Sequence, residues 1–116
     1  PAMCIVGEPT SMQVVNAHKG KLAQRVTVKG LEAHSSLPHT GVNAVDYAAE
    51  LVVYIRKLGK QLAEQGPHEE GFEVTYTTLH TGKINGGTAL NIVPKECTFD
   101  FEIRNIPGQD PVIRRY

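Results

Sequence analysis

Hydrophobic side chains in this 116-residue chain follow two different periods, and this change of period limits the folds it can adopt. From Ala44 to Leu58 they recur every three or four residues, which predicts one amphipathic helix. Asn43 can cap the start of this helix, and Gly59 or Gly66 could end it. From Cys97 to Arg104 they alternate with polar residues, which predicts a strand with one buried face.

Two further segments alternate in the same way, Leu22–Lys29 and Phe72–Tyr76. Strands with one polar face form a sheet that is covered on one side only. The order strand, helix, strand, strand therefore predicts α+β architecture, a ferredoxin-like antiparallel sheet with helices on one face. Asp110-Pro111 could open another helix, so we expect a fragment whose closing helix and strand lie beyond Tyr116.

The first residues are expected to form strands as well. Ala2–Val6 is a short apolar run typical of a buried strand, and it ends at Gly7-Glu8-Pro9-Thr10. Met12–Ala17 predicts a second strand, which a hairpin turn at Lys19-Gly20 would join to Leu22–Lys29.

The composition argues against several classes of function. The formal net charge is +0 and aromatic residues make up 6%, so neither nucleic acid nor an anionic membrane is an expected partner. The apolar runs are too short for a membrane span, and no signal peptide is evident. Cys4 and Cys97 form no CxxC pair, so a reducing, cytoplasmic setting is expected rather than a disulfide scaffold.

Five side chains could carry chemistry, and each also has an ordinary structural explanation. Glu8 follows a predicted buried strand, where functional carboxylates and surface turn acids both occur. Arg104 ends a strand and could bind a carboxylate with two hydrogen bonds or form a cross-strand salt bridge. Asn91 lies in a glycine-containing loop and could simply cap it. His34 and His39 could chelate a metal, although a hydrogen-bonded loop histidine is the commoner case.

The order of several short blocks resembles the M20 family of metallopeptidases and deacylases. Together the blocks cover essentially the whole chain, and their common order is more specific than any one of them. Within the family they most resemble acetylornithine deacetylases. The blocks are Gly7–Thr10, Gly30–Ser36, Pro38–Ala44, Gly86–Pro94 and Phe99–Arg104.

This resemblance implies the dimerisation, or lid, segment of a zinc-dependent amidohydrolase. Residues 1–12 would be the tail end of the catalytic domain, and residues 13–116 the dimerisation domain. Two zinc ions per active site, which cobalt could replace, would be held mainly by residues outside this chain. The chain alone is therefore expected to be inactive and to bind no metal tightly. The intact enzyme would be a cytoplasmic homodimer.

The resemblance also assigns roles to four residues. Glu8 matches a zinc ligand, and His34 matches the lid histidine that supports the oxyanion in the partner subunit's active site. Asn91 matches the lid asparagine near the substrate, and Arg104 the arginine that receives its carboxylate. The implied reaction is hydrolysis of N-acetylornithine to ornithine and acetate, a step of arginine biosynthesis.

Other functions stay open. A succinyl-diaminopimelate desuccinylase, or another M20 N-acyl amino-acid hydrolase or carboxypeptidase, would share the metal site and differ in the substrate pocket. A free-standing ferredoxin-like module would instead bind a small ligand in a pocket of its own.

Overall fold

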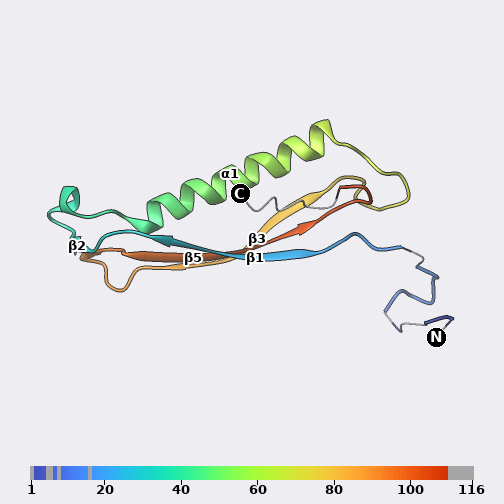
Figure 1. Cartoon of the computed structure of the whole chain (residues 1–116), viewed down its shortest axis with the longest axis horizontal. Coiled ribbons are helices and arrows are strands. Elements are labelled where there is room, and N and C mark those ends of the chain that lie inside the picture. Colours follow the sequence, from blue (N-terminus) through green and yellow to red (C-terminus); the bar gives the residue numbers. More distant parts are fainter. Residues whose placement is uncertain (1, 5–6, 8, 16, 110–116) are drawn as a thin grey trace.

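Figure 1 shows a single long helix lying along one face of an elongated sheet. The computed structural model describes residues 2–4, 7, 9–15 and 17–109. Short elements gather at one end of the sheet, and the chain leaves the helix at the other end. The elements are β1 (Leu22–Lys29), β2 (Ala33–His34), a 3-10 helix (Pro38–Thr40), α1 (Ala44–Gln65), β3 (Thr78–Gly86), β4 (Ile92–Val93) and β5 (Glu96–Arg104).

The main sheet is antiparallel and has the strand order β1-β5-β3. β1 pairs with β5 from Leu22↔Ile103 to Lys29↔Glu96. β3 pairs with the other side of β5, with a register shift between Thr81 and Lys83. β2 and β4 form a separate two-stranded sheet. The predicted α+β class, with a helix on one face of an antiparallel sheet, is confirmed.

Helix α1 begins where its cap was predicted. The side-chain oxygen of Asn43 accepts hydrogen bonds from the backbone amides of Val45 and Asp46, at 2.9 and 3.4 Å, which satisfies two of the free amides at the helix start. Of the two glycines that could end the helix, Gly66 does so, with a φ of 64°. Gly59 stays inside the helix and lies against Leu79 of β3.

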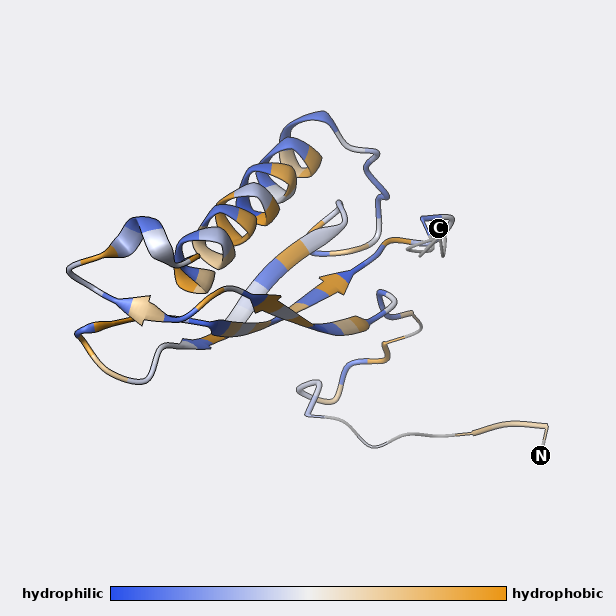
Figure 2. Ribbon diagram, turned by 60° about the vertical axis from the view of Figure 1, so that its left-hand side comes forward, coloured by the Kyte–Doolittle hydropathy of each residue, from blue (hydrophilic) through white to orange (hydrophobic). Residues whose placement is uncertain are grey.

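The core lies between α1 and the central strand. Small side chains on the helix let its backbone approach the large side chains of β5, and Figure 2 shows apolar and polar residues alternating along the strands. Gly86 of β3 belongs to this close contact, because a Cβ there would lie 2.8 Å from the Cys97 sulfur. The fully buried members of the core are Ala44, Ala48, Cys97 and Phe99, with Val26, Val28, Val45, Val52, Ile55 and Phe101 packed around them.

The opposite face of the sheet carries paired charges. The guanidinium of Arg25 donates two hydrogen bonds to the carboxylate of Asp100, at 2.7 and 2.8 Å, and Lys29 pairs with Glu96. The hydrogen bond from Arg25 keeps the pKa of Asp100 below its ordinary value. Such exposed pairs contribute little stability, so their main effect is to keep this face polar.

The strands predicted near the start of the chain are wrong where the structure describes them. Ala2–Cys4 is exposed and forms no strand, and residues 5 and 6 lie outside the described residues. Met12 and Val14 are almost fully exposed, and no hairpin turn forms at Lys19-Gly20. Gly20 instead exchanges two backbone hydrogen bonds with Asn105, which extends the pairing of β1 and β5. An apolar run becomes a strand only where another strand can pair with it.

The strand predicted over Phe72–Tyr76 is also wrong. β3 begins later, at Thr78, which pairs with Arg104. Beyond this pair the amide of Ile106 donates to the side-chain hydroxyl of Thr77 and not to a backbone carbonyl, so the ladder ends there. The preceding segment folds into a loop, in which the amide of Glu69 donates to the carbonyl of Thr75. The helix predicted at Asp110-Pro111 lies outside the described residues.

Two further features concern the setting of the protein. Cys4 is free and exposed, and Cys97 is free and buried, where burial raises the pKa of its thiol. Among the described residues, no helix combines the length and the apolar composition that a membrane span requires.

Candidate functional site

The small β2–β4 sheet brings two of the predicted site residues together. His34 is paired with Ile92, and the carbonyl of the neighbouring Asn91 accepts a hydrogen bond from the amide of Ser35, at 2.9 Å. Both His34 and Asn91 are exposed. They therefore lie at the same end of the molecule, the β2–β4 end, which Figure 1 shows at the left.

The loop that carries His34 is tied at its base. Leu31 and Val42 exchange two backbone hydrogen bonds of 2.9 Å, and the amide of Gly30 donates to the carbonyl of Lys95 at 2.8 Å. Gly30 is required here because a Cβ at this position would lie 2.1 Å from the carbonyl oxygen of Val42. The loop therefore leaves and rejoins the sheet at a fixed place.

His34 is held through one ring nitrogen. Its Nδ1 lies 2.8 Å from the hydroxyl oxygen of Ser36 and 3.2 Å from the backbone nitrogen of the same residue. The sequence did not identify Ser36 as a site residue. The available signal was general: serine often forms hydrogen bonds with a residue two positions away. His39, by contrast, lies in the exposed 3-10 helix that follows.

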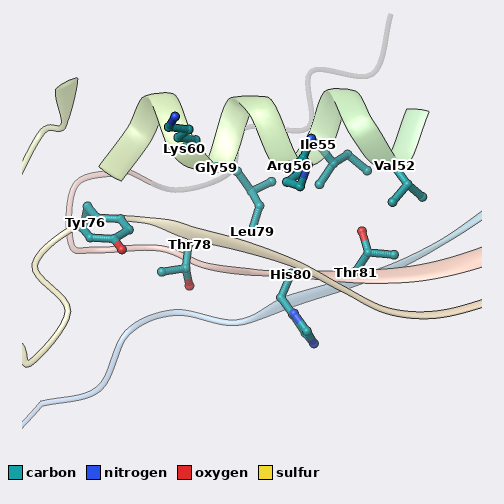
Figure 3. A pocket seen from close by; sticks show the side chains of 10 residues that line it. All are labelled: Val52, Ile55, Arg56, Gly59, Lys60, Tyr76, Thr78, Leu79, His80 and Thr81. Atoms are coloured by element: carbon teal, nitrogen blue, oxygen red, sulfur yellow. The ribbon is translucent and has the colours of Figure 1, made fainter. Parts of the chain in front are cut away.

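A hollow lies between α1 and the edge strand β3 and has a volume of about 410 Å³. Figure 3 shows Leu79 and Thr81 of β3 pointing toward the helix, while His80 points away from it. The helix contributes two apolar side chains to its lining, Val52 and Ile55, and two cations, Arg56 and Lys60. The full lining is Val52, Ile55, Arg56, Gly59, Lys60, Tyr76, Thr78, Leu79, His80 and Thr81.

Arg104 is the last residue of β5 and lies on the polar face of the sheet. Its Nε donates to a carboxylate oxygen of Glu102 at 3.3 Å, so the pair lies along one strand rather than across two. This hydrogen bond lowers the pKa of Glu102. The positive charges of Arg104 and Lys21 also lower this pKa, whereas burial raises it. The guanidinium thus contacts one carboxylate oxygen of its own strand.

Lys19, which the sequence did not single out, lies toward the same end of the sheet. Its ammonium group donates to the backbone carbonyl of Tyr76 and lies 5.7 Å from the centre of that ring. Partial burial lowers the pKa of Lys19. Its ion–ring contact depends on the loop before β3, which no pattern around Lys19 could reveal.

The predicted site residues therefore form two separate groups. His34 and Asn91 lie beyond the Glu96 end of β5, whereas Arg104 is its other end. A strand of 9 residues has ends about 26 Å apart, at about 3.3 Å per residue. A substrate the size of an amino acid cannot reach both groups of one copy. Glu8 lies outside the described residues.

Zinc in proteins takes three or four ligands from His, Cys, Asp and Glu. Within residues 2–4, 7, 9–15 and 17–109, no three such side chains lie close enough to hold a metal ion.

A substitution at Gly30 tests whether the base of the loop controls the His34 end. We expect Gly30→Ala to lower the free energy of unfolding by about 1–3 kcal/mol, because the added methyl group meets the Val42 carbonyl. Gly82→Ala is the matched control, since its Cβ would meet only the His80 ring at 3.6 Å. Chemical denaturation measures both; equal loss in the two variants would contradict the close contact.

Comparison with known proteins gives a consistent picture. The model of the M20 peptidase dimerisation domain family matches residues 16–114. A tripeptidase from Staphylococcus aureus is 26% identical with a TM-score of 0.57; the match covers 78% of this chain and 23% of that one. An aminobenzoyl-glutamate utilization protein from Klebsiella pneumoniae is 25% identical with a TM-score of 0.53, and the match covers 76% of this chain and 20% of that one.

Aminopeptidase PepT from Bacillus cereus shares the fold, with 23% identity and a TM-score of 0.52 over 81% of this chain and 24% of that one. This chain thus spans less than a quarter of each of these three solved chains.

Proposed function

We propose that residues 13–116 are the lid of a cytoplasmic zinc-dependent amidohydrolase. The basis is that this chain belongs to the M20 peptidase dimerisation domain family. Residues 1–12 would be the tail end of its catalytic domain, with Glu8 as this chain's single ligand to one of two zinc ions. The chain alone would be inactive, because zinc needs three or four ligands and the others would lie outside this chain.

The active site would combine groups from two copies of the chain. The observation that supports this is the length of the 9-residue strand β5, about 26 Å, which separates the His34 end from Arg104 within one copy. In a two-fold symmetric dimer, the His34 end of one copy can lie beside the Arg104 end of the other. Each site would then receive His34 and Asn91 from one subunit and Arg104 from its partner.

The proposed roles follow from the chemistry of these side chains. Arg104 would bind the carboxylate of the substrate, as its guanidinium now binds Glu102. His34 would donate a hydrogen bond to the oxyanion that forms when the amide carbon is attacked. Such a donor stabilises the transition state more than the ground state. Asn91, beside His34, would help to orient the acyl group.

The substrate we propose is N-acetylornithine, cleaved to ornithine and acetate in arginine biosynthesis. The blocks around His34, Asn91 and Arg104 support this choice by their resemblance to acetylornithine deacetylases. Succinyl-diaminopimelate and other N-acyl amino acids are the alternatives, and the likeness to a tripeptidase favours a small peptide as a third. Assaying the full-length parent protein against all of these separates them.

Mixed dimers of the full-length protein test the two-copy site. His34→Ala and Arg104→Ala should each lower kcat/KM by about 100-fold or more. Mixing the two variants should restore about a quarter of the wild-type activity, because half of the dimers are mixed and each contains one intact site. If one copy supplied both residues, the mixture would stay inactive.

The control for this experiment mixes His34→Ala with Asn91→Ala. Both residues lie at the β2–β4 end of the folded molecule, so one copy would supply both to a given site. Every site in the mixed dimer then lacks one of them. No recovery is expected. Recovery in this mixture would show that subunits supply His34 and Asn91 separately, and would contradict the proposal.

We also propose that the dimer surface includes α1 and the edge of β3, with the hollow of Figure 3 at its centre. β3 is an edge strand of the main sheet, so one side of its backbone can pair with a second copy. The apolar side chains of Val52 and Ile55, which line the hollow, would be covered in the dimer.

Two neighbouring cations on α1 provide the test. Arg56 lines the hollow, whereas Lys57 lies on another side of the helix, beside Tyr54. At micromolar concentration the wild-type protein should sediment as a dimer. We expect Arg56→Asp to weaken dimerisation by about fivefold or more and Lys57→Asp to have little effect. A monomeric wild type, or equal effects of the two variants, would contradict this surface.

A further inference from the structure

We infer that Ser36 is a positioning residue, which fixes the tautomer of His34 so that Nε2 carries the proton and can donate it in a hydrogen bond. This inference rests on the proposed function, because it specifies how His34 meets the oxyanion. It concerns a residue that contacts neither substrate nor metal in that proposal.

The geometry around Nδ1 determines where the proton lies. The backbone amide of Ser36 is 3.2 Å from Nδ1 and directs its hydrogen at it. An amide N–H can only donate, so Nδ1 must offer a lone pair. In a neutral imidazole the other nitrogen then carries the proton. This contact, at 3.2 Å a long hydrogen bond, favours the tautomer with the proton on Nε2 but leaves room for the hydroxyl group to strengthen the preference.

The hydroxyl group of Ser36 reinforces the same tautomer. Its oxygen is 2.8 Å from Nδ1, and a hydroxyl group can either donate or accept. A proton on Nδ1 of His34 would face the amide hydrogen of Ser36. The hydroxyl therefore acts as a second donor, and the two donors of Ser36 converge on one nitrogen.

The backbone holds Ser36 in this position. The amide of Leu37 donates to the carbonyl of His34 at 2.9 Å, which closes a turn around Ser36. His34 itself is anchored by its pairing with Ile92 in the β2–β4 sheet. Both His34 and Ser36 are exposed, so replacing the serine side chain leaves the core intact.

The tautomer matters because an oxyanion needs a donor. With the proton on Nε2, the outward side of the ring presents an N–H group. With the proton on Nδ1, the same side would present a lone pair, which repels a negatively charged oxygen. A group already oriented in the free enzyme needs no rearrangement during the reaction, and this is how oxyanion donors are most effective.

The experiment uses the full-length protein labelled with nitrogen-15 in its histidines. Ring-nitrogen chemical shifts, assigned by comparison with His34→Ala, report which nitrogen is protonated. In the wild type, His34 Nδ1 should be unprotonated. Ser36→Ala keeps the amide donor and loses the hydroxyl, so we expect the spectrum to move toward a mixture of tautomers and kcat to fall about 2- to 10-fold.

Two variants control for other effects. Ser36→Thr keeps both donors and should match the wild type in spectrum and kcat. Ser35→Ala removes the hydroxyl next in the chain, for which the described residues show no contact with His34, and should also match. A protonated Nδ1 in the wild type, or identical spectra for Ser36→Ala and Ser35→Ala, would overturn the inference.

The spectrum and the activity separate this inference from the proposed function. If His34→Ala keeps full activity while the wild-type spectrum shows a protonated Nε2, the role of His34 as oxyanion donor fails and the effect of Ser36 on the tautomer stands. If His34→Ala is inactive but Ser36→Ala leaves the spectrum unchanged, the proposed function stands and the inference is wrong.

Discussion

Strand β5 is the constraint on which the rest of this structure depends. It pairs with β1 on one side and β3 on the other, and it contributes Cys97 and Phe99 to the core beneath α1. Because it is a central strand of 9 residues, it also keeps its two ends at a fixed separation. The His34 end and Arg104 cannot approach each other without breaking the sheet. A small substrate that needs both must therefore lie between two copies.

The elements that the sequence predicted well are those whose pattern is local. The helical spacing around Ala48, the Asn43 cap and the alternation in β1 and β5 each depend on residues close together in the chain, and all are confirmed. Phe72–Tyr76 alternates equally well but forms no strand, and beyond Arg104 the amide of Ile106 donates to the side chain of Thr77 instead of continuing the ladder. Pairing partners are distant in sequence, so a local pattern does not reveal them.

The candidate site shows the same division. The residue types and their blocks singled out His34, Asn91 and Arg104, yet nothing in their spacing indicated that the first two are neighbours and the third is remote. That arrangement comes from the β2–β4 pairing and from the length of β5. The contact of Ser36 with His34 was missed because it depends on the direction of one amide within a turn. Glu8 lies outside the described residues, so its role stays a prediction.

The central claim is that one active site takes His34 from one subunit and Arg104 from the other, and a distance between subunits tests it most directly. Mixed dimers of the full-length protein would carry one spin label at His34→Cys in one copy and one at Arg104→Cys in its partner, with the exposed Cys4 replaced by serine. The labels should lie clearly closer between the subunits than within one copy, where the 9-residue strand β5, about 26 Å long, separates the two ends. A distance between subunits equal to or longer than that within one copy would contradict the account.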